Sequence, residues 1–302
     1  MEHSSTKKLF LTLVVTFLIF LIEIIGGILS NSLALLSDAG HVFTDALAIV
    51  LSLIASIIMK KPSGSKATFG YQRIGILTAF INGISLIIIA AFILIEGYKR
   101  LIEPPLINYN VMLPVAVFGF LGNLLMAWIL GHRHEDLNIK SAWLHVIGDT
   151  ISSFGVIVAA LIIRYTGWLI IDPIMSGFVG LIIITGGVRV LKDSIWIFLE
   201  LVPKGFNVEK ISNKIKEISE VVDIHDVHIW SIGSSIPAFS AHVVVKDCLL
   251  SEADRVRKKI EGILINVGIK HSVIQIESVK CDNSSIYCDF EKSLNYLNHS
   301  HS

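Results

Sequence analysis

Two pairs of ionisable residues lie inside long apolar segments of this 302-residue chain. His41 and Asp45 form the first pair, and His145 and Asp149 form the second. Within each pair the residues are four positions apart, so on a helix both side chains project from one face, one turn apart. Ionisable groups inside a membrane span are costly and usually functional. The spacing therefore predicts one four-ligand site between two helices, built from two imidazoles and two carboxylates.

A divalent metal ion that is bound and later released suits this ligand set. Zn²⁺ favours tetrahedral sites with imidazole nitrogen and carboxylate oxygen ligands. These groups must be deprotonated to bind, so metal binding expels protons and protonation expels metal. Because histidine titrates near neutral pH, the four groups predict the exchange of a metal ion for protons. A closed four-ligand set leaves no position for an activated water, which argues against a metalloenzyme.

Three other polar residues in the apolar segments have plainer interpretations. A lone intramembrane histidine or aspartate is often only a hydrogen-bonding group between helices. Asp38 lies one turn before His41, and we expect it to be a supporting partner of the ligands or a structural group near the turn between the first two helices, rather than a metal ligand. We expect Glu23 and Asn82 to make polar contacts between helices.

The composition places the chain among multi-pass membrane proteins. Hydrophobic residues make up 53% of it, and its mean hydropathy of +0.70 is too apolar for a soluble protein. The formal net charge of +0 offers no case for nucleic-acid binding. Six apolar segments approach the roughly 20 residues that span a bilayer. They are 9–29, 33–59, 74–95, 111–130, 143–163 and 173–199.

Basic residues near the ends of these segments predict the orientation in the bilayer. Lys99, Arg100 and Arg164 fall on one side, and a larger group falls on the other: Lys7, Lys8, Lys60, Lys61, Lys66, Arg73, Arg133 and Lys140. Basic residues favour the cytoplasmic side. An even number of spans then places both termini in the cytoplasm. We expect a multi-pass protein of the plasma membrane.

The chain becomes polar beyond Pro203, which predicts a separate cytoplasmic domain. Its periodicity predicts an αββαβ order, with helices at 207–220 and 251–267 and strands at 222–231, 238–246 and 272–279. This is a small α+β domain with its helices on one face of the sheet. Strict alternation along the first strand would place His228 and Trp230 on the opposite face from His225. The predicted organisation is a transport domain at 1–202, a cytoplasmic domain at 203–280 and a polar tail at 281–302.

Five stretches of the sequence resemble the cation diffusion facilitator family of divalent-metal/proton antiporters. They are SLALLSDAGHVFTDA (32–46), FGYQRIGILTAFING (69–83), GYKRLIEPP (97–105), SAWLHVIGDTISSFGV (141–156) and HDVHIWSIG (225–233). The resemblance covers almost the whole chain. It implies a homodimer of six-helix subunits with metallochaperone-like cytoplasmic domains. It also implies that His41, Asp45, His145 and Asp149 form the transport site, as in the zinc-preferring members.

The resemblance further implies an ion pair at the end of the helical domain. Arg73 and Glu200 match a pair that links the loop before the third helix to the end of the sixth.

Two loops depart from the family pattern. The loop 60–71 contains no His or Asp, so no metal site is expected there. The loop between the fourth and fifth helices keeps only His132 and His134, for which a solvated loop or weak metal binding are the alternatives.

A cytoplasmic regulatory metal site is also implied by the resemblance. His225, His242 and Glu277 match its ligands. Gln275 occupies a position where some members have His, so other groups would have to complete the coordination. The candidates are His271, Cys281 and Cys288. The alternative is a dimerisation domain with surface histidines and no metal.

Together these observations predict a secondary active transporter and no enzymatic activity. It would export Zn²⁺, with Co²⁺ or Cd²⁺ as further substrates, in exchange for protons. The expected partners are divalent metal ions, protons, the lipid bilayer and a second copy of the chain. Zn²⁺ is expected as substrate and regulatory ligand, with no organic cofactor. Two alternatives stay open: an exporter of Mn²⁺ or Fe²⁺, and a membrane-bound metal sensor without flux.

Overall fold

The computed structural model describes all residues except 1, 131–136, 235, 280–285 and 288–302. For residues 2–13, 130, 137–142, 144 and 145 only the backbone is described. The chain divides into two compact units. The first comprises Met1–Ala55 and Thr78–Lys192, and the second comprises Ser56–Leu77 and Asp193–Ser302.

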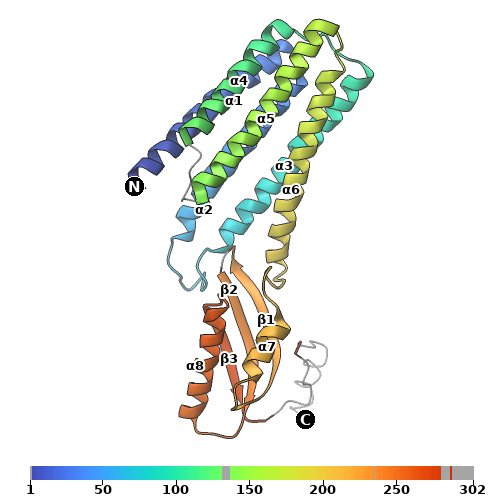
Figure 1. The fold of residues 1–302 in the computed structure, drawn as a ribbon. Coiled ribbons are helices and arrows are strands. Elements are labelled where there is room, and N and C mark those ends of the chain that lie inside the picture. The colour runs from blue at the N-terminus through green and yellow to red at the C-terminus, as the bar shows by residue number, and fades with distance from the viewer. Residues whose placement is uncertain (1, 131–136, 235, 280–285, 288–302) are drawn as a thin grey trace. The chain divides into compact units, whose positions relative to one another are not determined.

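Six long helices form the apolar part of the chain (Figure 1). They are α1 (Glu2–Ser30), α2 (Leu33–Met59), α3 (Arg73–Ile102), α4 (Tyr109–Leu130), α5 (Leu137–Thr166) and α6 (Ile171–Phe198). Helices α2 to α6 are long and apolar enough to cross a membrane, and the described apolar part of α1, Val14–Ser30, is shorter. Large apolar side chains such as Phe92 and Trp128 are exposed, which suits a lipid environment. The predicted multi-pass helical membrane domain is confirmed.

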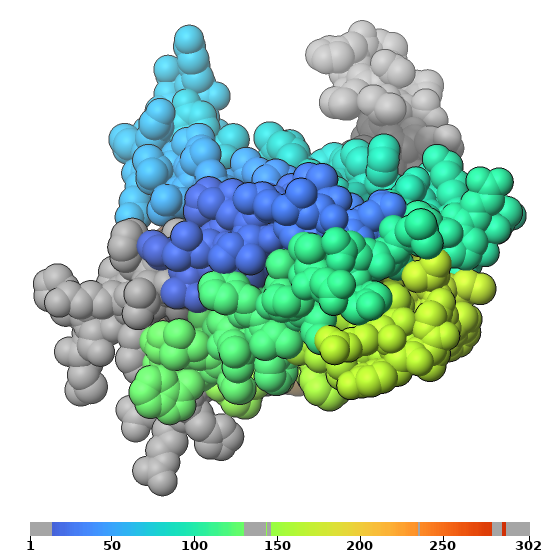
Figure 2. All heavy atoms as spheres, turned by 90° about the horizontal axis from the view of Figure 1, so that it is seen from above, coloured from blue at the N-terminus to red at the C-terminus, as the bar shows by residue number. Residues whose placement is uncertain are grey.

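Helix α1 packs closely against α4 because glycines on both helices admit side chains from the other. A Cβ at Gly122 would overlap Ile19, and a Cβ at Gly26 would overlap Val115. Small residues of this kind allow helix backbones to approach in a membrane. Figure 2 views the molecule from above and shows the blue residues of α1 beside the green residues of α4.

A second contact joins α3 to α6 at a pair of glycines. A Cβ at Gly83 would lie 3.2 Å from the carbonyl oxygen of Gly187. Buried apolar residues continue the contact along both helices: Ala90, Ile93, Val179 and Ile183. The helices can therefore cross this closely only because neither carries a side chain at the crossing point.

Hydrogen bonds to Asp172 connect the start of α6 to the start of α2. Its fully buried carboxylate accepts a hydrogen bond from Ser32 Oγ at 2.6 Å. It also accepts from the backbone N–H groups of Leu33 at 2.8 Å and Ala34 at 3.2 Å. The first N–H groups of a helix lack partners within the helix, and negative charge is favourable there. Asp172 thus caps α2 from another helix.

The second unit contains the predicted α+β domain. Its elements are α7 (Val208–Lys216), β1 (Val221–Gly233), β2 (Ile236–Val245), α8 (Leu250–Asn266) and β3 (His271–Glu277). The sheet order is β1-β2-β3, with β1 antiparallel and β3 parallel to β2. Apolar residues of both helices and the sheet form one buried core, including Ile215, Phe239 and Ile260. The αββαβ order is confirmed (Figure 1).

A β-bulge in β1 overturns the predicted alternation of side chains. His225 pairs with His242, whereas His228, three residues further along, pairs with Ser240. Ser240 and His242 are two residues apart and therefore share a face of the sheet. His228, and Trp230 after it, consequently lie on the same face as His225. The prediction that they lie on the opposite face is wrong, because an extra residue shifts the alternation.

The extra position of the bulge is occupied by Asp226. Its φ of +52° lies in the left-handed region, which aspartate tolerates better than most residues. The N–H of the next residue, Val227, donates to the carbonyl of Ile286 at 2.8 Å. Ile286 also packs against the domain core. Ile286, which belongs to the predicted polar tail at 281–302, is therefore attached to the sheet.

Candidate metal sites

Three of the four predicted transport ligands come together in the first unit. His41 and Asp45 project from α2, and Asp149 projects from α5. His41 Nε2 lies 3.8 Å from Asp45 Oδ2 and 3.6 Å from Asp149 Oδ1. Ligand atoms bound to a tetrahedral zinc ion lie about 3.4 Å from one another. We call these residues the membrane cluster, and their spacing is close to that of a zinc site.

The predicted fourth ligand is His145, one turn before Asp149 on α5. Its side chain lies outside the described residues, so its role stays a prediction. The side chains of His41 and Asp45 are each 23% exposed and that of Asp149 is 11% exposed. The cluster is therefore partly open, as entry and release of an ion require.

Asp38 supports this cluster from one turn away. Its Oδ1 accepts a hydrogen bond from Ser152 Oγ at 2.7 Å, and its Oδ2 accepts from Ser153 Oγ at 2.8 Å. Asn123 Nδ2 of α4 donates to Ser153 Oγ at 3.1 Å. These bonds join α2, α4 and α5 beside the ligands. Both carboxylate oxygens of Asp38 are engaged, which agrees with a supporting role.

The predicted cytoplasmic ligands also come together, on the sheet of the second unit. His242 Nδ1 lies 2.8 Å from Glu277 Oε1, and His225 Nε2 lies 3.4 Å from Glu277 Oε2. The two imidazole rings are 5.2 Å apart and meet nearly edge to face. His225 is 5% exposed, and its Nδ1 has no hydrogen-bond partner among the described residues. We call these three residues the sheet cluster.

Sequence comparisons match both halves of the chain. The family model of the cation efflux transmembrane domain matches residues 9–199, and that of the cation efflux protein cytoplasmic domain matches residues 203–279. This chain belongs to the cation efflux family. The two geometric clusters of this cation efflux protein lie one in each matched domain.

Curated relatives resemble the protein over nearly its whole length. It is 41% identical to the cadmium, cobalt and zinc/H⁺-K⁺ antiporter of Bacillus subtilis, over 92% of this chain and 90% of the relative. It is 39% identical to the protein of the same name from Bacillus velezensis, over 99% and 96%. It is 35% identical to the zinc transporter ZitB of Escherichia coli, over 99% and 96%.

The other residues considered for the cytoplasmic site differ in where they lie relative to the sheet cluster. Gln275 donates a hydrogen bond to Glu277 Oε1 at 2.9 Å, so it orients a predicted ligand. His271 pairs with Ala238, four residues along β2 from His242, and its ring packs edge-on against Phe69. It therefore lies away from the sheet cluster. Cys281, Cys288, His132 and His134 lie outside the described residues.

The bulge brings two residues to the sheet cluster that the sequence did not predict there. Asp226 Oδ2 lies 3.5 Å from His242 Nε2. Asp226 Oδ1 lies 3.0 Å from His228 Nε2. Imidazole and carboxylate groups therefore alternate across one face of the sheet. Their order in space is His225, Glu277, His242, Asp226 and His228. A periodic strand pattern gives no sign of a bulge, so sequence reasoning missed this arrangement.

Arg73 and Glu200 form the expected ion pair within the second unit. Arg73 donates to Glu200 Oε1, and both side chains are about half exposed. Glu200 has a φ of +55° at the end of α6, where the N–H of Leu201 bonds back to the carbonyl of Trp196. A left-handed residue of this kind commonly ends a helix. The function of the Arg73–Glu200 ion pair in transport stays a prediction.

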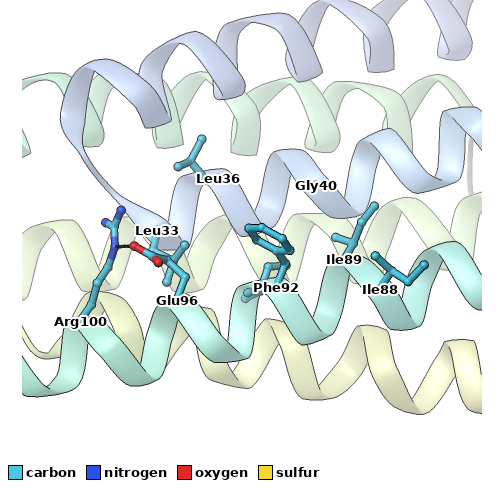
Figure 3. A pocket seen from close by; sticks show the side chains of 9 residues that line it. Leu33, Leu36, Gly40, Ile88, Ile89, Phe92, Glu96 and Arg100 are labelled. Atoms are coloured by element: carbon cyan, nitrogen blue, oxygen red, sulfur yellow. Dashed lines mark hydrogen bonds and ion pairs between the residues drawn. The ribbon is translucent and has the colours of Figure 1, made fainter.

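An apolar groove separates α2 from α3 near the membrane cluster (Figure 3). Its volume is about 450 Å³. Gly40, the neighbour of His41, lines it, and Arg100 bonds to Glu96 at one end, as Figure 3 shows. The groove shows that α2 and α3 are not packed tightly along this stretch.

Asp172 is a structurally important acid that sequence reasoning left outside the sixth span. A signal was present, because Asp followed by Pro is typical of a helix start. The sequence does not show that this carboxylate also reaches the start of α2. Only the packing of α6 on α2 shows that.

Proposed function

We propose that this cation efflux protein exports Zn²⁺ from the cytoplasm, with Co²⁺ and Cd²⁺ as further substrates. The spacing of His41, Asp45 and Asp149 carries the proposal, because His41 Nε2 lies 3.8 Å and 3.6 Å from the two carboxylates, close to the separation of about 3.4 Å between ligand atoms on a tetrahedral zinc ion. His145 is the proposed fourth ligand. Imidazole and carboxylate ligands suit zinc and also accept Co²⁺ and Cd²⁺. The names of the Bacillus and Escherichia relatives mention these metals.

Protons are the proposed counter-ions. A cation can bind the membrane cluster only when its ligands are deprotonated, so each transport cycle exchanges metal for protons at the same groups. The Bacillus relatives are named for both H⁺ and K⁺. Transport assays therefore need separate proton and potassium gradients. The basic residues near the span ends support cytoplasmic termini, which makes an inward proton gradient the driving force for export.

Alternating access is the proposed mechanism. Helices α3 and α6 share a glycine crossing and an apolar core, whereas a groove separates α3 from α2. The proposed motion is a tilt of α3 with α6 against the helices that hold the ligands. Such a tilt opens the cluster to one side of the membrane at a time.

The decisive experiment is metal uptake into proteoliposomes with an imposed pH gradient. We expect Zn²⁺ flux that follows the gradient and is lost in Asp149→Ala. Thr150→Ala is the matched control, since that hydroxyl bonds only to its own helix at Val146 among the described contacts. Parallel assays use Co²⁺, Cd²⁺, Mn²⁺ and Fe²⁺, and a K⁺ gradient without a pH gradient. Metal binding without flux would instead identify a sensor, and flux that survives Asp149→Ala would show that the site lies elsewhere.

We propose that the sheet cluster binds zinc as a regulatory ligand. His225, His242 and Glu277 would supply three ligands, and the buried Nδ1 of His225, which has no hydrogen-bond partner among the described residues, is consistent with a site that takes a metal ion. The protein is proposed to act as a homodimer through this domain. Metal bound in a dimeric cytoplasmic domain stabilises that domain and gives a route for sensing cytoplasmic zinc.

The ion pair of Arg73 and Glu200 is proposed to support the dimer. Arg73→Ala and Glu200→Ala should each reduce the dimer fraction or the zinc flux. The exposed pair of Lys204 and Asp193 offers a matched control in the same unit. Dimer fraction is measured by light scattering in detergent, beside flux in liposomes. Unchanged values for both Arg73 and Glu200 variants would contradict this role.

A further inference from the structure

Glu23 is a carboxyl group buried among the membrane helices. It is 1% exposed, and neither carboxyl oxygen has a hydrogen-bond partner among the described residues. Its side chain faces Gly119 of α4, where a Cβ would overlap Oε1. The glycine therefore leaves the space that the carboxyl fills. The expectation of a simple polar contact between helices does not describe this arrangement.

Asp38 shows how different the surroundings of Glu23 are. Two serine hydroxyls donate to Asp38, one to each oxygen. Donors of this kind stabilise a negative charge. No described donor reaches Glu23. An ionised carboxylate without donors in an apolar setting is far less favourable than the neutral acid.

The charged groups around Glu23 add to this contrast. Helix α4, the main contact of α1, contributes Gly119 here and has no charged residue along its length. Among the described residues, Asp38 of α2 and Asp149 of α5 are two ionisable groups within electrostatic reach of Glu23. Both are acids, and no ion pair joins Glu23 to a cationic side chain among the described residues, although His41 lies 3.6 Å from Asp149. A divalent cation held by Asp149 would balance a charge on Glu23.

We propose that Glu23 carries one of the protons exchanged for the metal. While the membrane cluster is empty, Glu23 is a neutral acid. When the divalent cation binds, the O–H bond of Glu23 breaks, the electron pair stays on the carboxylate, and the proton leaves to the side from which the cation came. When the cation departs to the opposite side, Glu23 takes a proton from that side. Glu23 thus couples proton and metal without being a metal ligand.

This inference rests on the proposed metal site, and the test separates the two. Zn²⁺ is titrated into the detergent-solubilised full chain, and the protons released per bound zinc are counted with a pH-sensitive dye in weak buffer. Every protein in the test carries His242→Ala, which removes binding at the sheet cluster. Glu23→Gln keeps the shape of the side chain and cannot release a proton. Thr16→Val is the matched control, because Thr16 lies two turns earlier on α1 and contacts Met126 of α4.

Glu23→Gln should release about one proton fewer per zinc, while zinc still binds. Thr16→Val should release as many as the parent. An equal count in Glu23→Gln and the parent overturns the inference while leaving the proposed function intact. Zinc binding and proton release that both survive Asp149→Ala overturn the proposed site, and with it this role of Glu23.

A spectroscopic measurement keeps the test decisive if Glu23→Gln does not fold. Infrared difference spectra of the His242→Ala parent are recorded on adding Zn²⁺. Loss of a protonated-carboxyl C=O band that shifts when the glutamates are ¹³C-labelled, and so does not arise from Asp45 or Asp149, supports the proposal. Absence of that loss overturns it.

Discussion

The membrane cluster and the sheet cluster use the same chemistry on different scaffolds. Each combines imidazole and carboxylate groups within ligand distance of one another. The membrane cluster joins two helices, α2 and α5, against which α3 and α6 are proposed to tilt. The sheet cluster joins three hydrogen-bonded strands, whose register is set by ladders of backbone bonds. A site between helices can change its access, whereas a site on a sheet suits static binding.

The supporting groups differ in the same way. Beside the membrane cluster, Asp38 of α2 accepts hydrogen bonds from two serines of α5. In the sheet cluster Gln275 supports Glu277 from within the same strand. Helical support can therefore be disturbed by small shifts between helices. Support within the strand moves with the ligand that it holds.

Removing one histidine from each cluster gives the largest expected contrast. His41→Ala should lower zinc flux about 100-fold or more, since a ligand counts for more than its supporting groups. His242→Ala should abolish zinc binding by the cytoplasmic domain and leave much of the flux. Flux in proteoliposomes and zinc binding by calorimetry check both. Loss of flux in His242→Ala equal to that in His41→Ala would erase the functional distinction.

Removing the cap on α2 tests how far the helical scaffold depends on contacts between helices. Asp172→Ala leaves a hydroxyl and two backbone N–H groups without their buried acceptor. We expect a destabilisation of about 3 kcal/mol. Thermal unfolding in detergent measures it, with Ser176→Ala as the control because that hydroxyl bonds within its own helix to the Asp172 carbonyl. Equal stability of the two variants would contradict the capping role.

A smaller effect should follow from removing the supporting groups alone. The double change Ser152→Ala and Ser153→Ala frees the carboxylate of Asp38. Zinc affinity at the membrane cluster should fall about 10-fold or more. Gln275→Leu should weaken the sheet cluster less, since Glu277 also contacts both histidines. Calorimetric titration of each variant compares them, and the reverse order would contradict the difference between the scaffolds.

The smallest effect concerns the α+β domain at low pH. Hydrogen bonds from Lys259 and then Ser219 lower the pKa of Glu220 to about 2. A carboxyl with a lower pKa in the folded state stabilises the fold above its ordinary pKa of 4.5 and loses that contribution as pH falls towards 2. Glu220→Gln should therefore reduce thermal stability slightly at neutral pH. The difference from the parent should shrink between pH 4.5 and 2, and a difference that persists at pH 2 would contradict this account.

Much of the architecture followed from patterns along the chain. The apolar segments predicted the long helices, and the change in composition after Pro203 predicted a separate α+β domain. The H-x-x-x-D spacing placed His41 beside Asp45 because a helix repeats every 3.6 residues. Local periodicity was sufficient in these cases because the features are local.

Features that depend on distant neighbours could not be predicted in the same way. The bulge at Asp226 places His228 on the face of His225, since strand pairing overrides simple alternation. Asp172 and the start of α2 lie about 140 residues apart in sequence, as the separation of Ser32 and Asp172 shows. No pattern around either segment states that they meet.

The sequence by itself determined which side chains can bind metal and which helices and strands carry them. Residue type and local periodicity depend only on the chain. The tertiary structure decided which carboxyl groups receive donors. Asp38 and Glu23 are both acids in apolar helices, yet one meets two serines and the other meets a glycine. The neighbours supplied by packing, rather than the carboxyl groups themselves, set this difference.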